Sequence, residues 1–307
     1  MLRYTVLRLG QAIFVMLVVT LLVAFAVRLS GDPVVALFQG ASAPNKTDLE
    51  RIRKALGVDR PFVVQYLEFV GGLMTGNLGK SFRNDQPVSA LISEKVPGTL
   101  VLAASSLIFS IVISVPLAIA SAVRKGRWLD RLVRLGSLIG LSFPNFWLAI
   151  MMILIFGVNL RWLPPSGFED WRSVIMPAVT LGLILTATNV RLLRAALLEV
   201  LSSQYITVAR SKGLLERVVL YKHALRNAAI PAVTFIGLQF GGLIGGVVII
   251  EQVFAWPGLG SLALNAISQR DYPVLQGTVA VLALVVVLVN LIIDLSYGLI
   301  DPRINST

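Results

Sequence analysis

The stretch YITVARSKGLLERVVLYKHALRNAAIP, residues 205–231, lies between two long apolar runs and carries most of its charge as cations. One acid, Glu216, accompanies five basic residues: Arg210, Lys212, Arg217, Lys222 and Arg226. Moving those charges through lipid is costly, so the segment is expected to stay in water on the cytoplasmic side. Gly213 interrupts an apolar stripe that has helical spacing, formed by Val208, Leu214, Leu215, Val218, Val219 and Leu225. The pattern predicts a surface on which a partner protein docks.

Composition places this surface in a polytopic membrane protein. The 307 residues are 56% hydrophobic and 14% charged, and the mean hydropathy is +0.81, outside the usual range of soluble domains. Backbone groups in lipid must bond internally, so each span should be helical. We expect an all-α membrane fold with six spans, because six windows can cross about 30 Å of hydrocarbon: residues 9–29, 99–121, 137–158, 174–196, 229–250 and 276–298.

The distribution of basic residues predicts the topology. Two short loops hold clusters of arginine and lysine, around residues 124–134 and 205–226, whereas the short loops between them hold few. This positive-inside pattern places both termini in the cytoplasm and residues 30–98, 159–173 and 253–275 outside. It also explains the formal charge of +11 without nucleic acid. The segments expected are 1–29, the outer loop 30–98, a five-helix core 99–298 with a cytoplasmic loop 197–230, and a cytoplasmic tail 299–307.

The first apolar window also resembles a signal peptide, because Arg3 and Arg8 precede it. Its apolar core from Leu9 to Val27 is long for a signal, and no small-x-small cleavage site closes it, so we expect a retained anchor. The chain has no cysteine, which excludes disulfides and thiolate chemistry.

The outer loop 30–98 is too long and too well patterned to be a simple connection. Thr47 can cap one helix that Gly57 ends, Pro61 can open a second, and Pro87 can open a third. We expect these short amphipathic helices to pack on the outer mouth of the bundle or to meet a partner from that side.

Two features of the spans leave alternatives open. Pro116, Pro144 and Pro177 fall in three spans, and we favour ordinary intramembrane prolines over kinks beside a cavity. A glycine series at 237, 241, 242, 245 and 246 allows close helix approach, either between subunits or within one bundle.

The chain offers little chemistry of its own. Residues 74–81, MTGNLGKS, end like a P-loop, but Met74 stands where the motif needs glycine. The single histidine, His223, excludes a His–His metal site, and we expect it to have a structural role. Glu251 and Asp294 are acids of spans 5 and 6, and we interpret both as structural groups near span ends.

An ordered set of motifs runs along the chain. One loop carries LSSQY at 201–205, ARSKGL at 209–214, HALRN at 223–227 and Ile230-Pro231. Further stretches are GDP at 31–33, LGVDRP at 56–61, GNLG at 76–79, SFP at 142–144, WLP at 162–164, EQVFAWPGLG at 251–260, RDYP at 270–273 and DP at 301–302. Together they resemble the ABC importer permeases that serve dipeptides, oligopeptides, nickel and glutathione, with the first loop as the signature loop. The large outer loop resembles that of the first-type permease of a pair. The sequence departs from the broader importer pattern at Thr207 and at 223–226, and Gln204 stands where the peptide branch often has an acid.

The resemblance implies that the loop forms a coupling helix seated on a cytoplasmic ATPase. The residues carried over are Tyr205, Ala209, Arg210, Ser211, Lys212, Gly213 and Leu214. It implies a heterodimer with a second permease, two ATPase subunits that bind ATP and Mg²⁺, and an extracytoplasmic solute-binding protein. This chain would hold no cofactor or metal and would catalyse no reaction.

We therefore expect a multi-pass permease of a bacterial inner membrane that imports peptides, with glutathione and nickel chelates as further candidates. Two rival functions remain at this point: a stand-alone secondary transporter, and a membrane anchor for a cytoplasmic enzyme.

Overall fold

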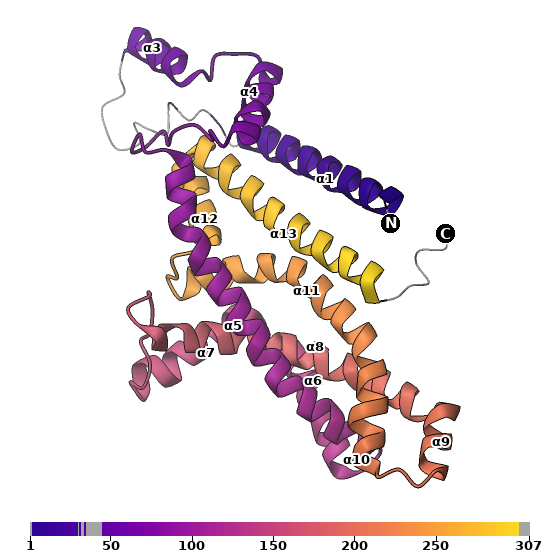
Figure 1. Cartoon of the computed structure of the whole chain (residues 1–307). Helices are drawn as coiled ribbons and strands as arrows, with labels where there is room; N and C mark the ends of the chain where they lie inside the picture. Colours follow the sequence, from indigo (N-terminus) through magenta and orange to yellow (C-terminus); the bar gives the residue numbers. More distant parts are fainter. Residues whose placement is uncertain (1, 30, 32–33, 35–44, 301–307) are drawn as a thin grey trace. The chain divides into compact units, whose positions relative to one another are not determined.

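The computed structural model describes residues 2–29, 31, 34 and 45–300, without the side chains of 2–5, 46, 48, 293–300 and much of 230–245. Helices dominate this part of the chain, and one isolated bridge joins Lys80 to Pro87. Two compact units are present, residues 1–99 with 257–307 and residues 100–256. Figure 1 labels their helices. The all-α expectation is confirmed.

The first unit is built around two long apolar helices, α1 (Leu2–Leu29) and α13 (Tyr272–Ile300), which pack against each other. The shorter helix α12 (Leu259–Gln269) packs on α13. Its first residue donates a backbone hydrogen bond to Thr99 Oγ1 at 2.8 Å. Asp271, at the start of α13, is buried and accepts hydrogen bonds from the Ser81 hydroxyl and from the Phe82 N–H. These bonds hold the end of the outer loop against the first turn of α13.

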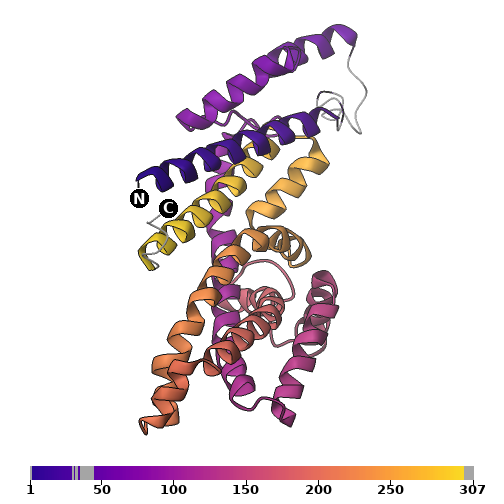
Figure 2. The same ribbon diagram turned by 90° about the vertical axis from the view of Figure 1, so that its right-hand side faces the viewer.

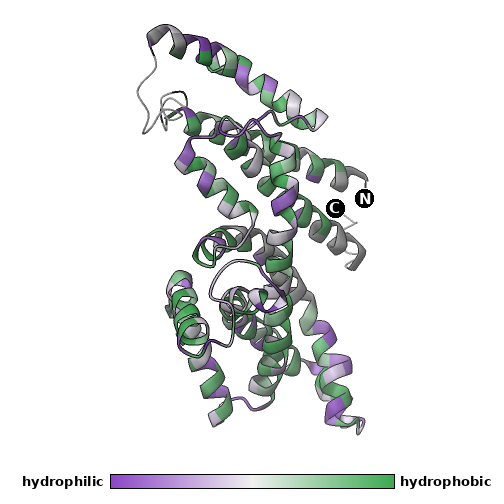
Figure 3. Ribbon diagram, turned by 90° about the vertical axis from the view of Figure 1, so that its left-hand side faces the viewer, coloured by the Kyte–Doolittle hydropathy of each residue, from purple (hydrophilic) through white to green (hydrophobic). Residues whose placement is uncertain are grey.

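The outer loop folds into helices, as expected. Helix α3 (Lys46–Leu56) ends at Gly57, which has φ 68°, and helix α4 (Phe62–Thr75) follows Pro61 and ends at Gly76. The predicted cap at Thr47 is wrong, because α3 already begins at Lys46 after Asn45. Figure 3 shows that α3 is largely hydrophilic, whereas α1 and α13 are mostly hydrophobic.

The third short helix expected after Pro87 does not exist as a separate element. Residues Val88–Val123 form one helix of 36 residues, α5, which continues through Pro97, Gly98 and Pro116. Hydropathy finds only the part of a helix that can sit in lipid, and Glu94 and Lys95 end that part early. The sequence boundary at residue 99 therefore marks a change of environment within α5 and no change of secondary structure.

The second unit contains the one sharply broken apolar segment among the described residues. Helices α6 (Trp128–Ser142) and α7 (Asn145–Met152), the latter continued by the π-helical η1 (Ile153–Asn159), meet at 98°. Phe143 between them is extended at ψ 135°, the conformation favoured before a proline. Pro144 thus marks a real break. Pro177 lies in the first turn of α8 (Ile175–Leu201), where proline is tolerated.

Four helices in the described residues are long and apolar enough to cross a membrane, and the bent pair makes a fifth candidate. These four are α1, α5, α8 with its preceding 3₁₀ turn η2 (Trp171–Val174), and α13. Helix α11 (Leu225–Val253) has the length of a span and packs on α8, but the structure does not describe many of its side chains. Figure 2 shows α11, drawn in orange, beside α8.

Candidate coupling surface

The segment that the sequence predicts to be cytoplasmic folds into short helices between α8 and α11. Helix α9 (Gln204–Ser211) begins after Ser203, and the short α10 (Glu216–Val218) leads into the π-helical η3 (Val219–Ala224). Asn227, on α11, donates from Nδ2 to the Tyr205 hydroxyl at 2.8 Å. That bond fastens the start of α9 to the first turn of α11.

One face of α9 is part of a hydrophobic cluster. Ile206 is completely buried and Ala209 is 8% exposed. They pack with residues from the ends of α5, α8 and α11 and from η3: Ala118, Ala122, Leu193, Leu197, Val219, Ala224 and Ala228. The small side chain of Ala209 therefore lets α9 approach these helices, and the segment rests on the ends of several long helices at once.

The opposite face presents most of the residues predicted to dock. Tyr205, Arg210, Ser211, Lys212, Gly213 and Leu214 are all exposed. The stripe expected from spacing is divided: Val208 and Leu215 face solvent, whereas Val219 is fully buried. Sequence periodicity could not assign Ala209 to the inner face, because the chain reverses at Gly213 and the helical period does not continue across it.

Gly213 adopts φ 77° at the end of α9, a conformation that glycine reaches without strain. Its N–H donates to the Arg210 carbonyl at 2.9 Å, and the Leu214 N–H donates to the Ala209 carbonyl. These bonds close the helix end in the manner of a C-terminal cap. A Cβ placed at Gly213 would meet no atom within 4 Å, so the position opens outward.

An ion pair spans this turn. Arg210 donates from Nη2 to Glu216 Oε1 at 2.6 Å and from Nε to Oε2 at 3.1 Å. The hydrogen bonds from Arg210 hold the pKa of Glu216 below its usual value, and those to Glu216 raise the pKa of Arg210. Both groups therefore stay charged at neutral pH. The pair is half-exposed and is expected to fix the shape of the turn more than the stability of the fold.

A buried ion pair between α6 and α8 is a feature that the sequence did not predict. Asp130 is 1% exposed and accepts two hydrogen bonds from Arg194, at 2.7 and 2.9 Å. The Ser121 hydroxyl and the Gly126 N–H also donate to its carboxylate. Asp130, near the start of α6, thereby links Ser121 near the end of α5 to Arg194 in the last third of α8. The sequence predicts a basic loop here, and the one signal for the pair is that Asp130 is the only acid in RKGRWLDRLVR, residues 124–134.

The other residues singled out have structural settings. His223 lies in η3, and its carbonyl accepts from Asn227 at 3.1 Å. Glu251 is fully buried two residues before α11 ends, and its carbonyl accepts from the Trp256 N–H. The side chain of Asp294 lies outside the described residues. In the P-loop-like stretch, Gly76 caps α4, and the chain there follows a helix.

The sequence matches two families along nearly its whole length. Residues 114–306 match the family described as the binding-protein-dependent transport system inner membrane component, and residues 1–103 match the corresponding N-terminal region. The chain belongs to this family. It is a permease subunit of an ABC importer in the bacterial inner membrane.

Named relatives of the permease cover it from end to end. It is 39% identical to the glutathione transport system permease protein GsiC of Escherichia coli O6:H1 (strain CFT073) and 40% identical to GsiC of Salmonella typhimurium (strain LT2). Each alignment covers 305 residues, 99% of both chains.

The permease also shares its fold with a solved transporter. A chain of the inward-facing MetNI methionine ABC transporter superposes with a TM-score of 0.59 at 23% identity. The match covers 69% of the permease and 96% of that chain. At this identity the match shows the fold alone.

Proposed function

We propose that this permease forms one half of a six-plus-six-helix importer whose transport cycle is driven by ATP hydrolysed on separate subunits. Its own half contributes six spans: α1, α5, the bent α6–α7 pair, α8, α11 and α13. Both termini lie in the cytoplasm, and residues 30–98 lie outside. The charge distribution around the spans supports this orientation.

The coupling proposal depends mainly on one observation. The exposed turn at Arg210–Leu214 is carried by a helix whose inner face packs on the ends of α5, α8 and α11. A displacement of this turn by an ATPase would therefore be passed to three spans together, because packed interiors transmit strain. Tyr205, Arg210, Ser211, Lys212, Gly213 and Leu214 form the contact surface, and Ala209 lets α9 seat against the spans.

The partners follow from this division of labour. A second permease completes the translocation path, two ATPase subunits bind ATP and Mg²⁺, and an extracytoplasmic solute-binding protein delivers the solute. In this proposal the permease itself holds no cofactor and makes no covalent bond. The family's description as binding-protein-dependent supports the last partner.

We propose a short peptide as the solute, with glutathione, itself a tripeptide, as the first candidate to test. Relatives that cover 99% of the chain are named glutathione transport system permease proteins. Dipeptides, longer peptides and nickel chelates are the next candidates.

Reconstitution tests the function directly. The permease, co-expressed with its partner subunits and reconstituted into vesicles, should accumulate labelled glutathione or peptide only with ATP on the ATPase side and with binding protein on the other. Uptake driven by an ion gradient with the permease alone would instead show a secondary transporter. Absence of uptake under every condition, with a cytoplasmic enzyme retained on the membrane, would show an anchor.

A further inference from the structure

Helix α4 has an exposed apolar face that no other element of the described residues covers. None of the residues of α4 is buried. Val63, Leu67 and Met74 are 62%, 63% and 86% exposed, and their spacing places them on one side of a helix. Glu68 lies off this stripe and pairs with Arg60, so the stripe carries no charge.

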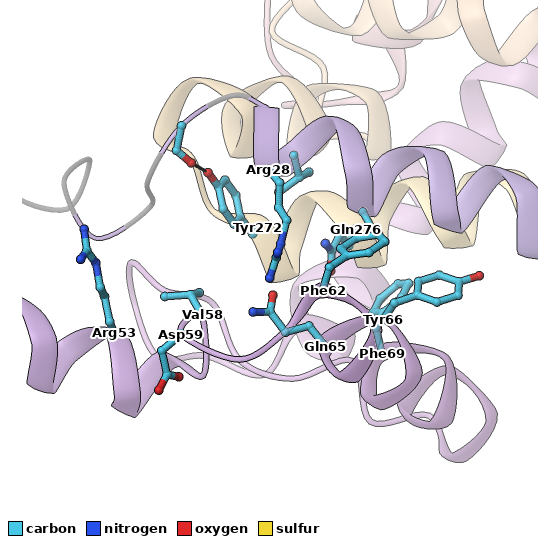
Figure 4. Close-up of a pocket in the computed structure, with 13 residues that line it drawn as sticks. Arg28, Arg53, Val58, Asp59, Phe62, Gln65, Tyr66, Phe69, Tyr272 and Gln276 are labelled. Atoms are coloured by element: carbon cyan, nitrogen blue, oxygen red, sulfur yellow. Dashed lines mark hydrogen bonds between the residues drawn. The ribbon is translucent and has the colours of Figure 1, made fainter.

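A second face of α4 is turned toward α1. Phe62 packs edge-on against Phe25, with ring centroids 6.3 Å apart, and lies under the Arg28 guanidinium at 5.2 Å. Figure 4 shows Phe62, Tyr66 and Phe69 on this side, at a cavity of about 540 Å³ between α4, α1 and α13. The exposed stripe lies on the flank of α4 next to this contact face, roughly 110° away around the helix.

Contacts with α1 set the depth of α4. The Tyr66 hydroxyl donates to the Leu17 carbonyl at 3.0 Å and lies 3.2 Å from Thr20 Oγ1. Leu29 ends α1, so Leu17 lies roughly 18 Å below that end at about 1.5 Å per residue. This carbonyl therefore lies near the middle of the apolar segment Val6–Leu29, which is long enough to cross a hydrocarbon layer of about 30 Å. A tyrosine side chain is only about as long as one helical turn, so the backbone of α4 lies below the end of α1.

The neighbouring surface of α1 is itself apolar and exposed. Leu21 and Leu22 are exposed, and Phe25, at the edge of the α4 contact, also remains exposed, as expected of a span that contacts lipid. Helix α3 differs, because its sequence KTDLERIRKAL is strongly charged. The two helices of the outer loop are thus suited to different surroundings.

We propose that α4 is a membrane-embedded helix, with its Val63–Leu67–Met74 stripe in contact with lipid acyl chains beside α1, while α3 stays in water. The occupant of the stripe is lipid, because the stripe is uncharged and continues the apolar surface of a span at the same depth. The outer loop is thereby anchored, and its water-facing part, including α3, is left to meet the solute-binding protein of the proposed function, on which this last step rests.

The chain's lack of cysteine allows a direct test by spin labelling. Val63→Cys and Leu67→Cys carry a nitroxide on the stripe, Leu22→Cys marks lipid beside α1, and Glu50→Cys on α3 marks water. In nanodiscs containing phosphatidylethanolamine and phosphatidylglycerol, collisions with oxygen and with a water-soluble nickel chelate are measured by electron paramagnetic resonance. All four positions are exposed on the full-length chain, so the substitutions leave packed contacts intact.

The stripe labels should behave like Leu22→Cys, with oxygen collisions exceeding nickel collisions several-fold, and Glu50→Cys should show the reverse. Nickel collisions at Val63→Cys and Leu67→Cys as frequent as at Glu50→Cys would place the stripe in water and overturn the proposal. Low collision rates with both reagents would mean that protein covers the stripe, which also overturns it. The measurement is made with and without the partner subunits, so that a covering subunit is identified.

Discussion

At the scale of single residues, Gly213 carries the clearest functional prediction. A β-branched residue at φ 77° is strained by about 1–2 kcal/mol, and its side chain would project into the open space where the ATPase is proposed to seat. Gly213→Val should therefore leave membrane insertion unchanged and reduce ATP-driven uptake by about tenfold or more. Uptake by vesicles, normalised to permease content, is the measurement.

Gly57→Val is the matched control. Gly57 also has a positive φ, 68°, and also has nothing within 4 Å of an added Cβ, so it imposes similar strain at the end of α3. Uptake should remain close to that of the unmodified transporter. Equal losses in the two variants would indicate general strain and would count against docking at Gly213.

Asp130 carries a stability prediction. Asp130→Ala leaves the Arg194 guanidinium, 17% exposed, without its carboxylate, a loss that costs about 3–5 kcal/mol for a buried pair. The apparent melting temperature in detergent should fall by roughly 10 °C. Replacing both partners, as Asp130→Ala with Arg194→Met, should recover part of this loss because no unpaired charge remains.

Arg134→Ala tests the same carboxylate from its exposed side. Arg134 lies 3.8 Å from Asp130 but is 52% exposed, so its removal should cost less than about 1 kcal/mol. A fall as large as that of Asp130→Ala would show that burial of the Arg194 pair is not what matters.

At the scale of elements, the α9–α10 turn depends on its ion pair for shape. Glu216→Ala removes both hydrogen bonds to Arg210 and should lower stability by no more than about 1 kcal/mol, because the pair is half-exposed. Uptake should nevertheless fall several-fold, since the docking turn loses its fixed geometry. Glu199→Ala, at an exposed acid of α8, should leave uptake unchanged. An unaffected Glu216→Ala transporter would show that the turn is held by its backbone alone.

The pH dependence of this pair follows from its direction. Arg210 holds the pKa of Glu216 below 4.5, so the contribution of the pair is complete above that value and is lost only as pH falls through the lowered pKa. Between pH 6 and 8 both members of the pair stay charged, so the pair should cause no change in ATP-driven uptake over this range.

The sequence predicted elements well where a local signal defines them. Gly57 and Pro61 marked real helix boundaries, and Gly213 marked the end of α9. Hydropathy failed at Val88–Thr99, because the polar start of α5 is helical outside its apolar window. It also failed at Pro144, because intramembrane prolines sit in both straight and broken helices, and only the neighbouring packing decides.

At the scale of the whole molecule, the predictions that needed long-range contacts were the incomplete ones. The coupling segment was found from its charge and motifs, yet the inward face of Ala209 depends on α5 and α8, which are far away in sequence. The Asp130–Arg194 pair joins residues 64 positions apart, and no local pattern near Asp130 indicates that Arg194 is its partner. Charge patterning locates a surface, whereas packing determines which of its residues face a partner.

The most direct test of coupling measures which side of the membrane the Arg210–Leu214 turn faces and what covers it. Lys212→Cys introduces a single cysteine into a cysteine-free chain at an exposed position. We predict that a membrane-impermeant maleimide labels it only from the cytoplasmic side, and that labelling falls several-fold when the ATPase subunits are bound. Labelling only from outside, or cytoplasmic labelling that the ATPase subunits do not reduce, would contradict a coupling role for this turn.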